Sequence, residues 1–253
     1  TYANENAHLL QDILRRDWGF TGAVVTDWGG SNDHALGVKN GSTLEMPAPG
    51  GDAVRELMAA VKSGKISEAD VDARLDELLT LVCDTHAAVQ NHSRSFDADA
   101  HHALARRAAA ESTVLLKNED DLLPLAAGTK VAVIGDFAET PRYQGTGSSA
   151  VNSIKVDSLL GCWGESGLEQ VGFAAGFNRQ GKPDAAKQAE AVALAQKADV
   201  VLLCMGLDEI KESEGLDRSD MCVAANQIEL LRALQEVNPN IVVVLSAGAS
   251  VET

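Results

Sequence analysis

Basic residues and aromatic residues are both scarce in this sequence. The chain has 21 lysines and arginines against 37 aspartates and glutamates, which gives a formal net charge of -16, and 4% of its residues are aromatic. Such an acidic chain repels the phosphates of nucleic acids and the surfaces of anionic membranes, so we expect neither as a partner. A small neutral molecule fits this charge better.

Cysteine is also sparse, and its four copies, Cys83, Cys162, Cys204 and Cys222, lie far apart. The sequence contains no C-x-x-C pair and no combined set of cysteine and histidine ligands. This spacing argues against a structural zinc site and against a disulfide framework, so we expect no metal. The cysteines are interpreted as small core residues or free thiols.

Long apolar runs are absent as well. No run reaches the length that a bilayer-spanning helix needs, and the N-terminus carries no basic and apolar signal pattern. The default expectation is therefore a cytoplasmic protein. The chain begins at Thr1 without a methionine and stops shortly after a strand and a loop, so we expect both ends to be cut from a longer polypeptide.

The most informative stretch covers residues 22–30. Residues 23–25 form a short apolar run without alternation, which is typical of a strand covered on both faces. Two glycines follow closely and allow a sharp turn, so the pattern predicts Asp27 at the C-terminal tip of a strand, where α/β barrels place their chemistry. Capping of the next helix by Asp27 explains the spacing equally well. The neighbouring Trp28 is either an apolar platform for a ligand ring or a packing residue.

The first part of the chain alternates predicted helices and strands with short connections, an order typical of a parallel α/β unit. The expected helices cover residues 4–16, 33–39, 53–61 and 67–82, and the expected strands cover 23–25 and 41–46. Residues 84–97 lose the apolar periodicity and are interpreted as a linker. We therefore place the domain boundary between residues 92 and 93.

The second part contains three near-continuous apolar runs, which predict buried parallel strands. These strands are expected at 130–135, 198–206 and 240–248, with a further strand at 113–117 and helices at 185–196 and 227–237. The order predicts a mostly parallel sheet wrapped by helices, in which loops at the carboxyl ends of the strands bind ligands.

Two of these loops carry polar motifs. The motif at 145–149 lacks the G-x-x-x-x-G-K-[ST] spacing of a phosphate loop, so we expect no nucleotide and no other cofactor. It offers hydroxyl and N–H groups to a polar ligand, with Ser148 as the candidate residue. The motif at 212–218 gathers three carboxylates and an arginine, and such crowding can raise the pKa of one carboxyl and keep a general acid protonated. The alternative is a solvated acidic loop with an ion pair between Asp217 and Arg218.

Two carboxylates on loops of two domains suggest hydrolysis of a glycosidic bond. At this point several segments resemble glycoside hydrolase family three, which contains many β-glucosidases and β-xylosidases. Trp18–Gly29 resembles the nucleophile strand of the family, with Thr26 where serine is usual. The other matching segments are Leu44–Pro47 at the end of the last barrel strand, Glu111–Asn118, Leu123–Leu125 and Val131–Gly135 at the start of the second domain, and Glu212–Arg218.

The resemblance implies a retaining glycosidase of the β-glucosidase type, which cleaves terminal β-linked sugars from a small-molecule or oligosaccharide substrate. It implies that Asp27 is the nucleophile. It also implies that Glu214, which directly precedes the glycine of its loop, is the acid/base residue, with Glu212 as the alternative. Trp28 and Ser148 are then the candidate substrate-binding residues.

The resemblance also implies an α/β fold. Residues 1–92 are expected to form a partial (β/α)8-type barrel segment with a linker, and residues 93–253 an α/β/α sandwich with a mostly parallel sheet. A complete barrel takes about 250 residues, so we expect the chain to be a fragment of a larger enzyme. The exposed strand edges of such a fragment favour association into a homo-oligomer. The rival hypothesis is a catalytically inactive remnant that binds carbohydrate or serves as a scaffold.

Overall fold

The computed structural model describes residues 2–91 and 95–252, and the chain divides into two compact units, Thr1–Phe96 and Asp97–Thr253. The boundary expected between residues 92 and 93 lies outside the described residues. Among the described residues, no helix is both long and apolar enough to cross a membrane.

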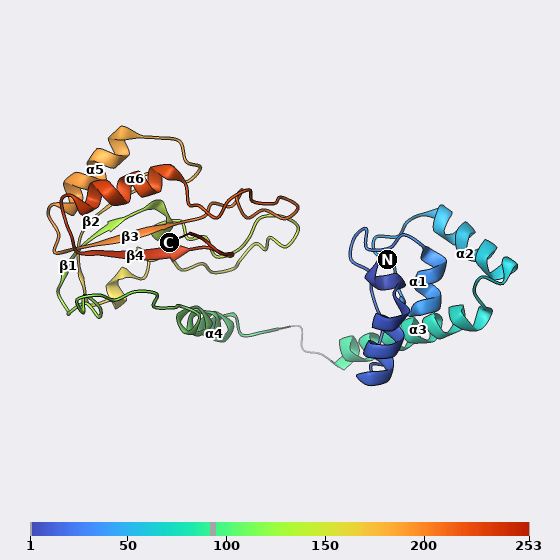
Figure 1. The fold of residues 1–253 in the computed structure, drawn as a ribbon. Helices are drawn as coiled ribbons and strands as arrows, with labels where there is room; N and C mark the ends of the chain where they lie inside the picture. The colour runs from blue at the N-terminus through green and yellow to red at the C-terminus, as the bar shows by residue number, and fades with distance from the viewer. Residues whose placement is uncertain (1, 92–94, 253) are drawn as a thin grey trace. The chain divides into compact units, whose positions relative to one another are not determined.

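The first unit is mainly helical (Figure 1). Its elements are η1 (Ala3–Glu5), η2 (His8–Asp17), α1 (His34–Asn40), α2 (Gly51–Ser63) and α3 (Glu68–Asn91). The helix expected at the N-terminus is present, but it is a π-helix preceded by a short 3-10 turn. Helix α3 is longer than expected and includes residues 84–91 of the presumed linker, because that segment contains no glycine or proline to end it.

The two strands expected in this unit form only a minimal parallel pair. Val25 and Leu44 make an isolated bridge, with the Thr26 N–H donating to the Leu44 carbonyl at 3.0 Å and the Leu44 N–H donating to the Val24 carbonyl at 3.0 Å. Within the described residues of this unit neither segment has a further strand partner, so the pair depends on side-chain contacts with the helices around it.

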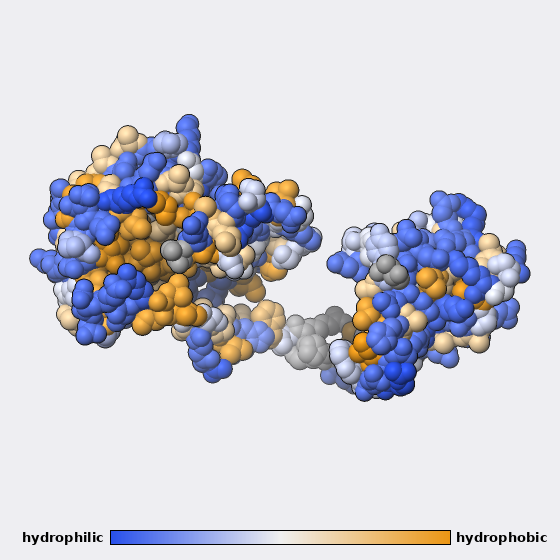
Figure 2. All heavy atoms as spheres, in the orientation of Figure 1, coloured by the Kyte–Doolittle hydropathy of each residue, from blue (hydrophilic) through white to orange (hydrophobic). Residues whose placement is uncertain are grey.

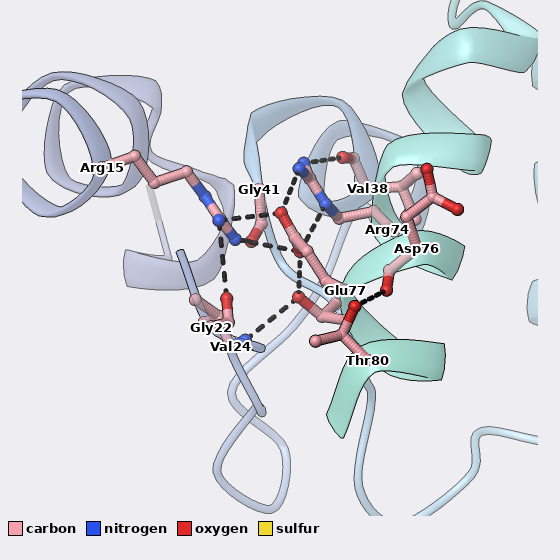
Figure 3. Close-up of polar contacts among 10 residues, drawn as sticks. Arg15, Gly22, Val24, Val38, Gly41, Arg74, Asp76, Glu77 and Thr80 are labelled. Atoms are coloured by element: carbon pink, nitrogen blue, oxygen red, sulfur yellow. Dashed lines mark hydrogen bonds and ion pairs between the residues drawn. The ribbon is translucent and has the colours of Figure 1, made fainter. Parts of the chain in front are cut away.

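The main contact of this kind is made by Glu77 of α3 (Figure 3). Its carboxylate forms ion pairs with Arg15 at 2.7 Å and with Arg74 at 2.6 Å, and it accepts a hydrogen bond from the Thr43 hydroxyl at 2.6 Å. The Thr43 hydroxyl in turn accepts from the Val24 N–H at 3.0 Å. Glu77 therefore connects helix η2 and both strand segments to α3.

The first unit exposes several hydrophobic side chains, which appear as orange groups on its surface (Figure 2). A groove of about 520 Å³ lies between α1, α2 and α3. Its apolar lining consists of Val38, Leu57, Met58, Val61, Val71, Leu75 and Leu78. No residue of α3 is buried, so this unit keeps an apolar surface that its own helices leave uncovered.

The second unit is an α/β domain with a four-stranded, fully parallel sheet in the order β2-β1-β3-β4. Its elements are α4 (Ala98–Glu111), β1 (Lys130–Ile134), η3 (Asp136–Ala138), η4 (Trp163–Glu165), β2 (Glu169–Ala174), α5 (Ala185–Ala195), β3 (Val200–Gly206), α6 (Ala225–Gln235) and β4 (Ile241–Ser246). Helices α5 and α6 lie together on one side of the sheet (Figure 1). The predicted α/β fold with a parallel sheet is confirmed.

The core of this unit forms around the two central strands. Val131–Ile134 of β1 and most of β3 are buried, and the apolar faces of α5 and α6 pack against them. Strand β1 is followed by Gly135, which has φ +104°, and an added Cβ would overlap the carbonyl oxygen of Cys204. Gly206 at the end of β3 approaches the Ser246 carbonyl in the same way. Only glycine allows the strand ends to lie so close together.

One expected strand is absent and one observed strand was not expected. Residues 113–117 have no regular structure, and Val114, Leu115 and Leu116 are exposed, because no described strand lies beside them. Strand β2 pairs with β1 although its sequence, Glu169–Ala174, begins with two polar residues and contains Gly172. Burial against α5 explains this strand, since Leu194 packs over Gly172.

Replacement of Glu77 by glutamine is expected to loosen the first unit. The change leaves two nearly buried guanidinium groups without their counter-charge, which costs about 3 kcal/mol. Hydrogen exchange of the Thr26 and Leu44 amides measures this loss and should accelerate by roughly 100-fold. The control is Asp52→Asn, which removes an exposed ion pair with Arg55. Unchanged protection in Glu77→Gln would show that the strand pair is held by other contacts.

Replacement of Gly135 by alanine is expected to destabilise the second unit by roughly 2–5 kcal/mol, because it combines an unfavourable backbone conformation with overlap at Cys204. Gly128→Ala is the matched control. Gly128 also has positive φ but has open space around it, so only the conformational cost of about 1–2 kcal/mol applies. Hydrogen exchange in β1 and β3 compares the two variants, and equal effects would contradict the packing argument.

Candidate active-site loops

Asp27 lies at the end of the short strand segment and is exposed. The preceding Thr26 is buried, with its hydroxyl accepting from the Met46 N–H at 2.9 Å and donating to the Met46 carbonyl at 3.2 Å. This anchor fixes the chain just before the turn, and the Asp27 carboxylate accepts from the Trp28 N–H at 2.7 Å. The carboxylate is therefore presented to solvent at a held position, as the sequence pattern predicted for a strand tip.

The capping alternative for Asp27 is wrong, because Asp33 caps the next helix. The Asp33 carboxylate accepts from the Leu36 N–H at 2.9 Å at the start of α1. This contact, together with the hydrogen bonds that the Lys65 ammonium group donates to the same carboxylate, lowers the pKa of Asp33. Asp27 makes no such helix contact and stays available for another role.

Trp28 sits on the outer side of the same turn. Its side chain is 66% exposed, so it does not pack into the core of this unit. The turn is closed by the Gly30 N–H, which donates to the Asp27 carbonyl at 2.9 Å, with Gly29 at φ +75°. An open indole beside a carboxylate is compatible with the predicted platform for a sugar ring.

A pair that the sequence patterns did not reveal lies at the carboxyl end of the neighbouring strand segment. His34 opens α1, and its Nδ1 lies 2.7 Å from the Glu45 carboxylate. The Nε2 of the same ring lies 3.9 Å from Glu56. The histidine is separated by 11 residues from Glu45, so no local motif marks the pair. The contact between His34 and Glu45 connects the start of α1, which follows the Asp27 turn, to the end of the strand segment that contains Leu44.

In the second unit the polar motifs lie on loops that follow β1 and β3, at the carboxyl edge of the sheet. Ser148 donates from both its N–H and its hydroxyl to one carboxylate oxygen of Glu214, each at 2.6 Å. The Glu214 N–H donates to the Thr146 carbonyl at 2.8 Å, beside the bridge between Thr146 and Ser213. The structure thus brings together two predicted site residues, Ser148 and Glu214, that are 66 positions apart.

Gly147 makes this contact sterically feasible. It has φ +134°, and an added Cβ would come within 2.5 Å of the Glu214 side chain. Because Gly147 has no side chain, the Glu214 carboxylate can lie close enough to the loop to bind Ser148. No larger side chain fits at this position without moving Glu214 away from Ser148.

The hydrogen bonds from Ser148 lower the pKa of Glu214, with the hydroxyl as the larger cause and the backbone N–H as the second. The expectation that crowding raises the pKa of a carboxyl is wrong for Glu214. The reason is that the neighbouring carboxylate, Glu212, is neutralised by an arginine, so it exerts little repulsion, whereas two donors favour the charged form of Glu214.

Glu212 has a side chain that is only 9% exposed, and it is paired with Arg142 from the loop after β1. Both of its carboxylate oxygens also accept from the Gly248 N–H at 3.0 Å, in the loop after β4. Arg142 donates in addition to the Leu207 carbonyl at 3.3 Å. These contacts occupy Glu212 fully, which favours Glu214 over Glu212 as the residue that meets a ligand.

Arg179 makes a second connection between the same loops. Its guanidinium pairs with Asp136 at 3.1 Å and with Glu209 at 2.5 Å, donates to the Thr140 carbonyl at 2.5 Å, and lies 4.2 Å from the ring centroid of Phe137. Sequence patterns did not indicate Arg179, because it lies in the irregular connection after β2. Its importance becomes visible only in the structure, where the side chain is buried and contacts several loops.

Arg218 at the end of the acidic motif binds the backbone of another loop. Its Nη2 donates to the Ser250 carbonyl at 2.5 Å. The expected local pair with Asp217 is replaced by this contact, which ties the loop after β3 to the loop after β4. Among the described residues, no cluster of three or more histidine, cysteine, aspartate or glutamate side chains has the arrangement of a metal site.

The fold and these loops define an α/β protein whose polar groups gather at the carboxyl edge of a parallel sheet, the usual place for ligand binding in this class. Residues 113–253 match the model of the glycosyl hydrolase family 3 C-terminal domain. This match covers more than half of the chain, and the chain therefore belongs to glycosyl hydrolase family 3.

Several relatives match almost the whole chain. The exo-α-(1→6)-L-arabinopyranosidase of Bifidobacterium breve is 43% identical over 258 residues, which cover 98% of this chain and 34% of that protein. The thermostable β-glucosidase B of Acetivibrio thermocellus is 40% identical over 256 residues, which cover 99% of this chain and 34% of that protein. The chain spans about a third of the length of these relatives.

Solved structures show the same similarity. The crystal structure of a β-glucosidase from Bifidobacterium adolescentis matches with a TM-score of 0.90 at 43% identity and covers 99% of this chain and 37% of that one. The β-glucosidase 3B of Thermotoga neapolitana, solved with α-D-glucose, matches with a TM-score of 0.82 at 26% identity and covers 99% and 39%.

Replacement of Ser148 by alanine is expected to raise the pKa of Glu214, because the larger of the two donors to the carboxylate is lost. Because the pKa of Glu214 is lowered in the folded chain, the contact stabilises the fold fully at pH values above the ordinary pKa of a glutamate. This stabilisation is lost as the pH falls through the pKa that Glu214 has in the folded chain. A carbon-13 NMR titration of the Glu214 carboxyl group measures this shift. Ser149→Ala is the control and should leave the titration unchanged.

Proposed function

We propose that this chain supplies the catalytic loops of a retaining β-glycosidase, with Asp27 as the nucleophile and Glu214 as the acid/base residue. The observation that carries the proposal is the presentation of the two carboxylates. Each is exposed at the carboxyl end of a parallel strand or on the loop that follows it, and each is held by a backbone N–H, that of Trp28 or of Ser148. Membership in the family supports the reaction class.

In the proposed reaction, the Asp27 carboxylate attacks the anomeric carbon and the bond to the leaving oxygen breaks. Glu214 donates a proton to that oxygen, and a glycosyl ester forms on Asp27. In the second step the ionised Glu214 takes a proton from water, the water oxygen attacks the anomeric carbon, and the ester bond breaks. Asp27 and the protonated Glu214 are thereby restored.

The hydrogen bonds from Ser148 to Glu214 favour the ionised carboxylate, which is the form that acts as a base in the second step. Proton donation in the first step requires a higher pKa. We infer that a bound sugar draws the Ser148 hydroxyl away from Glu214, which removes the larger stabilisation of the charged form. Ser148 then binds a sugar hydroxyl, and Trp28 supports a ring.

The preferred substrate is proposed from the relatives. Those named above are β-glucosidases and an exo-α-(1→6)-L-arabinopyranosidase, so a terminal β-glucoside and an α-L-arabinopyranoside are the two substrates to compare. The rival function is carbohydrate binding without turnover. The exposed and open Trp28 turn supports it, because stacking on an indole requires no catalytic pair.

The proposal is tested in a chimera in which residues 1–253 replace the matching third of the Acetivibrio β-glucosidase. Glu214→Gln is expected to lower kcat for a 4-nitrophenyl β-glucoside by about 10²–10⁴-fold, the usual contribution of a general acid/base group. Asp27→Asn should abolish labelling by a 2-deoxy-2-fluoroglucoside, and mass spectrometry should find the label on the Asp27 peptide of the unmodified chimera.

Asp217→Asn is the matched control, since it removes another exposed carboxylate of the same loop and should leave kcat nearly unchanged. A folded chimera that turns over substrate equally well with Glu214→Gln would refute the role of that residue. A folded chimera without turnover, combined with glucose binding that shifts the Trp28 indole resonance of the chain, would establish the binding function instead.

A further inference from the structure

Arg142 and Glu212 form a nearly buried ion pair at the base of the two loops that carry Ser148 and Glu214. Their side chains are 6% and 9% exposed. Three loops meet at this pair, because Glu212 also accepts from the Gly248 N–H and Arg142 also donates to the Leu207 carbonyl. The pair therefore connects the chain segments after β1, β3 and β4 in one place.

The pair is close in sequence to both partners of the Ser148 and Glu214 contact. Glu212 precedes Glu214 by two residues, and Arg142 precedes Ser148 by six. Between the ion pair and that contact lies a short parallel bridge of Thr146 with Ser213, whose backbone bond from the Glu214 N–H to the Thr146 carbonyl is 2.8 Å long. The two loops thus run side by side from the ion pair to Ser148 and Glu214.

A single bridge specifies register weakly, and a slip by one residue reverses the direction of every side chain. A slip here would turn Glu214 away from Ser148. The ion pair opposes such a slip, because any other register would separate two charges that are largely shielded from water. Removing the two charges from water has a free-energy penalty that offsets much of their attraction. The pair therefore contributes more to the geometry of the loops than to the net free energy of folding.

We propose that Arg142 and Glu212 are positioning residues that hold the loops after β1 and β3 in the register in which Ser148 donates to Glu214. Their catalytic importance rests on the proposed function of Glu214. The positioning itself is a property of this chain and does not require turnover.

The test is a carbon-13 NMR titration of Glu214 in the chain of 253 residues. Glu212→Gln is expected to raise the pKa of Glu214 toward the ordinary value of a glutamate, as far as Ser148→Ala does or further, because both Ser148 donors are then lost. Lys211→Met is the matched control, since it removes an exposed pair with Asp220 from the same loop. It should leave the Glu214 titration unchanged.

A second variant, Arg142→Met combined with Glu212→Leu, separates positioning from stability. It replaces the ion pair by apolar side chains of similar size, which conserves packing. The proposal expects intact hydrogen-exchange protection in β1 and β3 together with a raised pKa of Glu214. If either variant keeps that protection and titrates like the unmodified chain, the pair does not position Glu214 and the proposal is overturned.

The outcome is independent of the proposed function. The titration reports the contact between Ser148 and Glu214 without any substrate, whereas the chimera reports the catalytic roles of Asp27 and Glu214. A Glu214 titration that the Arg142 and Glu212 variants leave unchanged refutes only the positioning. A folded chimera whose kcat is unaffected by Glu214→Gln refutes only the catalytic assignment.

Discussion

The second unit is constrained most strongly by the close approach of its parallel strands at their carboxyl ends. Gly135 and Gly206 lie against the carbonyl groups of the next strand, where a Cβ has no room. Because β1, β3 and β4 are adjacent and parallel, the loops that follow them leave from the same edge. Polar groups from distant parts of the sequence are thereby brought within hydrogen-bonding distance, and the geometry of the candidate site follows from this arrangement.

Arginine side chains hold these loops together. Arg142 joins the loop after β1 to a carboxylate and a carbonyl group of the loop after β3, and Arg179 binds groups of both loops from the connection after β2. The side chains of both arginines are almost inaccessible to solvent. The first unit uses the same solution, in which Arg15 and Arg74 enclose Glu77 beneath the strand pair. A planar guanidinium group donates in several fixed directions, so one buried residue can fix several segments. In both units the carboxylate proposed for catalysis is exposed, whereas a second carboxylate, Glu77 or Glu212, is largely enclosed by arginine side chains.

The sequence predicted much of the second unit, because its central strands are almost continuous apolar runs. β1, β3, β4, α5 and α6 all occur where they were expected. Strand β2 was missed because it begins with two polar residues and its apolar residues are interrupted by Gly172. Residues 113–117 were wrongly expected to form a strand, because an apolar run with β-branched residues looks the same with or without a neighbouring strand. In the first unit α2 was predicted closely, but the end of α3 was not, because the loss of apolar periodicity does not end a helix that lacks glycine and proline.

For the site, the sequence by itself determined which side chains stand at the strand ends. The glycines after Asp27 and around Ser148 and Glu214 require turns at those positions, and turns after buried strands place polar residues at the sheet edge. Only the tertiary structure decided which groups pair. Arg142 with Glu212, Ser148 with Glu214 and Arg15 with Glu77 are each separated by more than 60 residues. Their pairing, and with it the lowered pKa of Glu214, depends on the register of loops and helices in space, which no local pattern encodes.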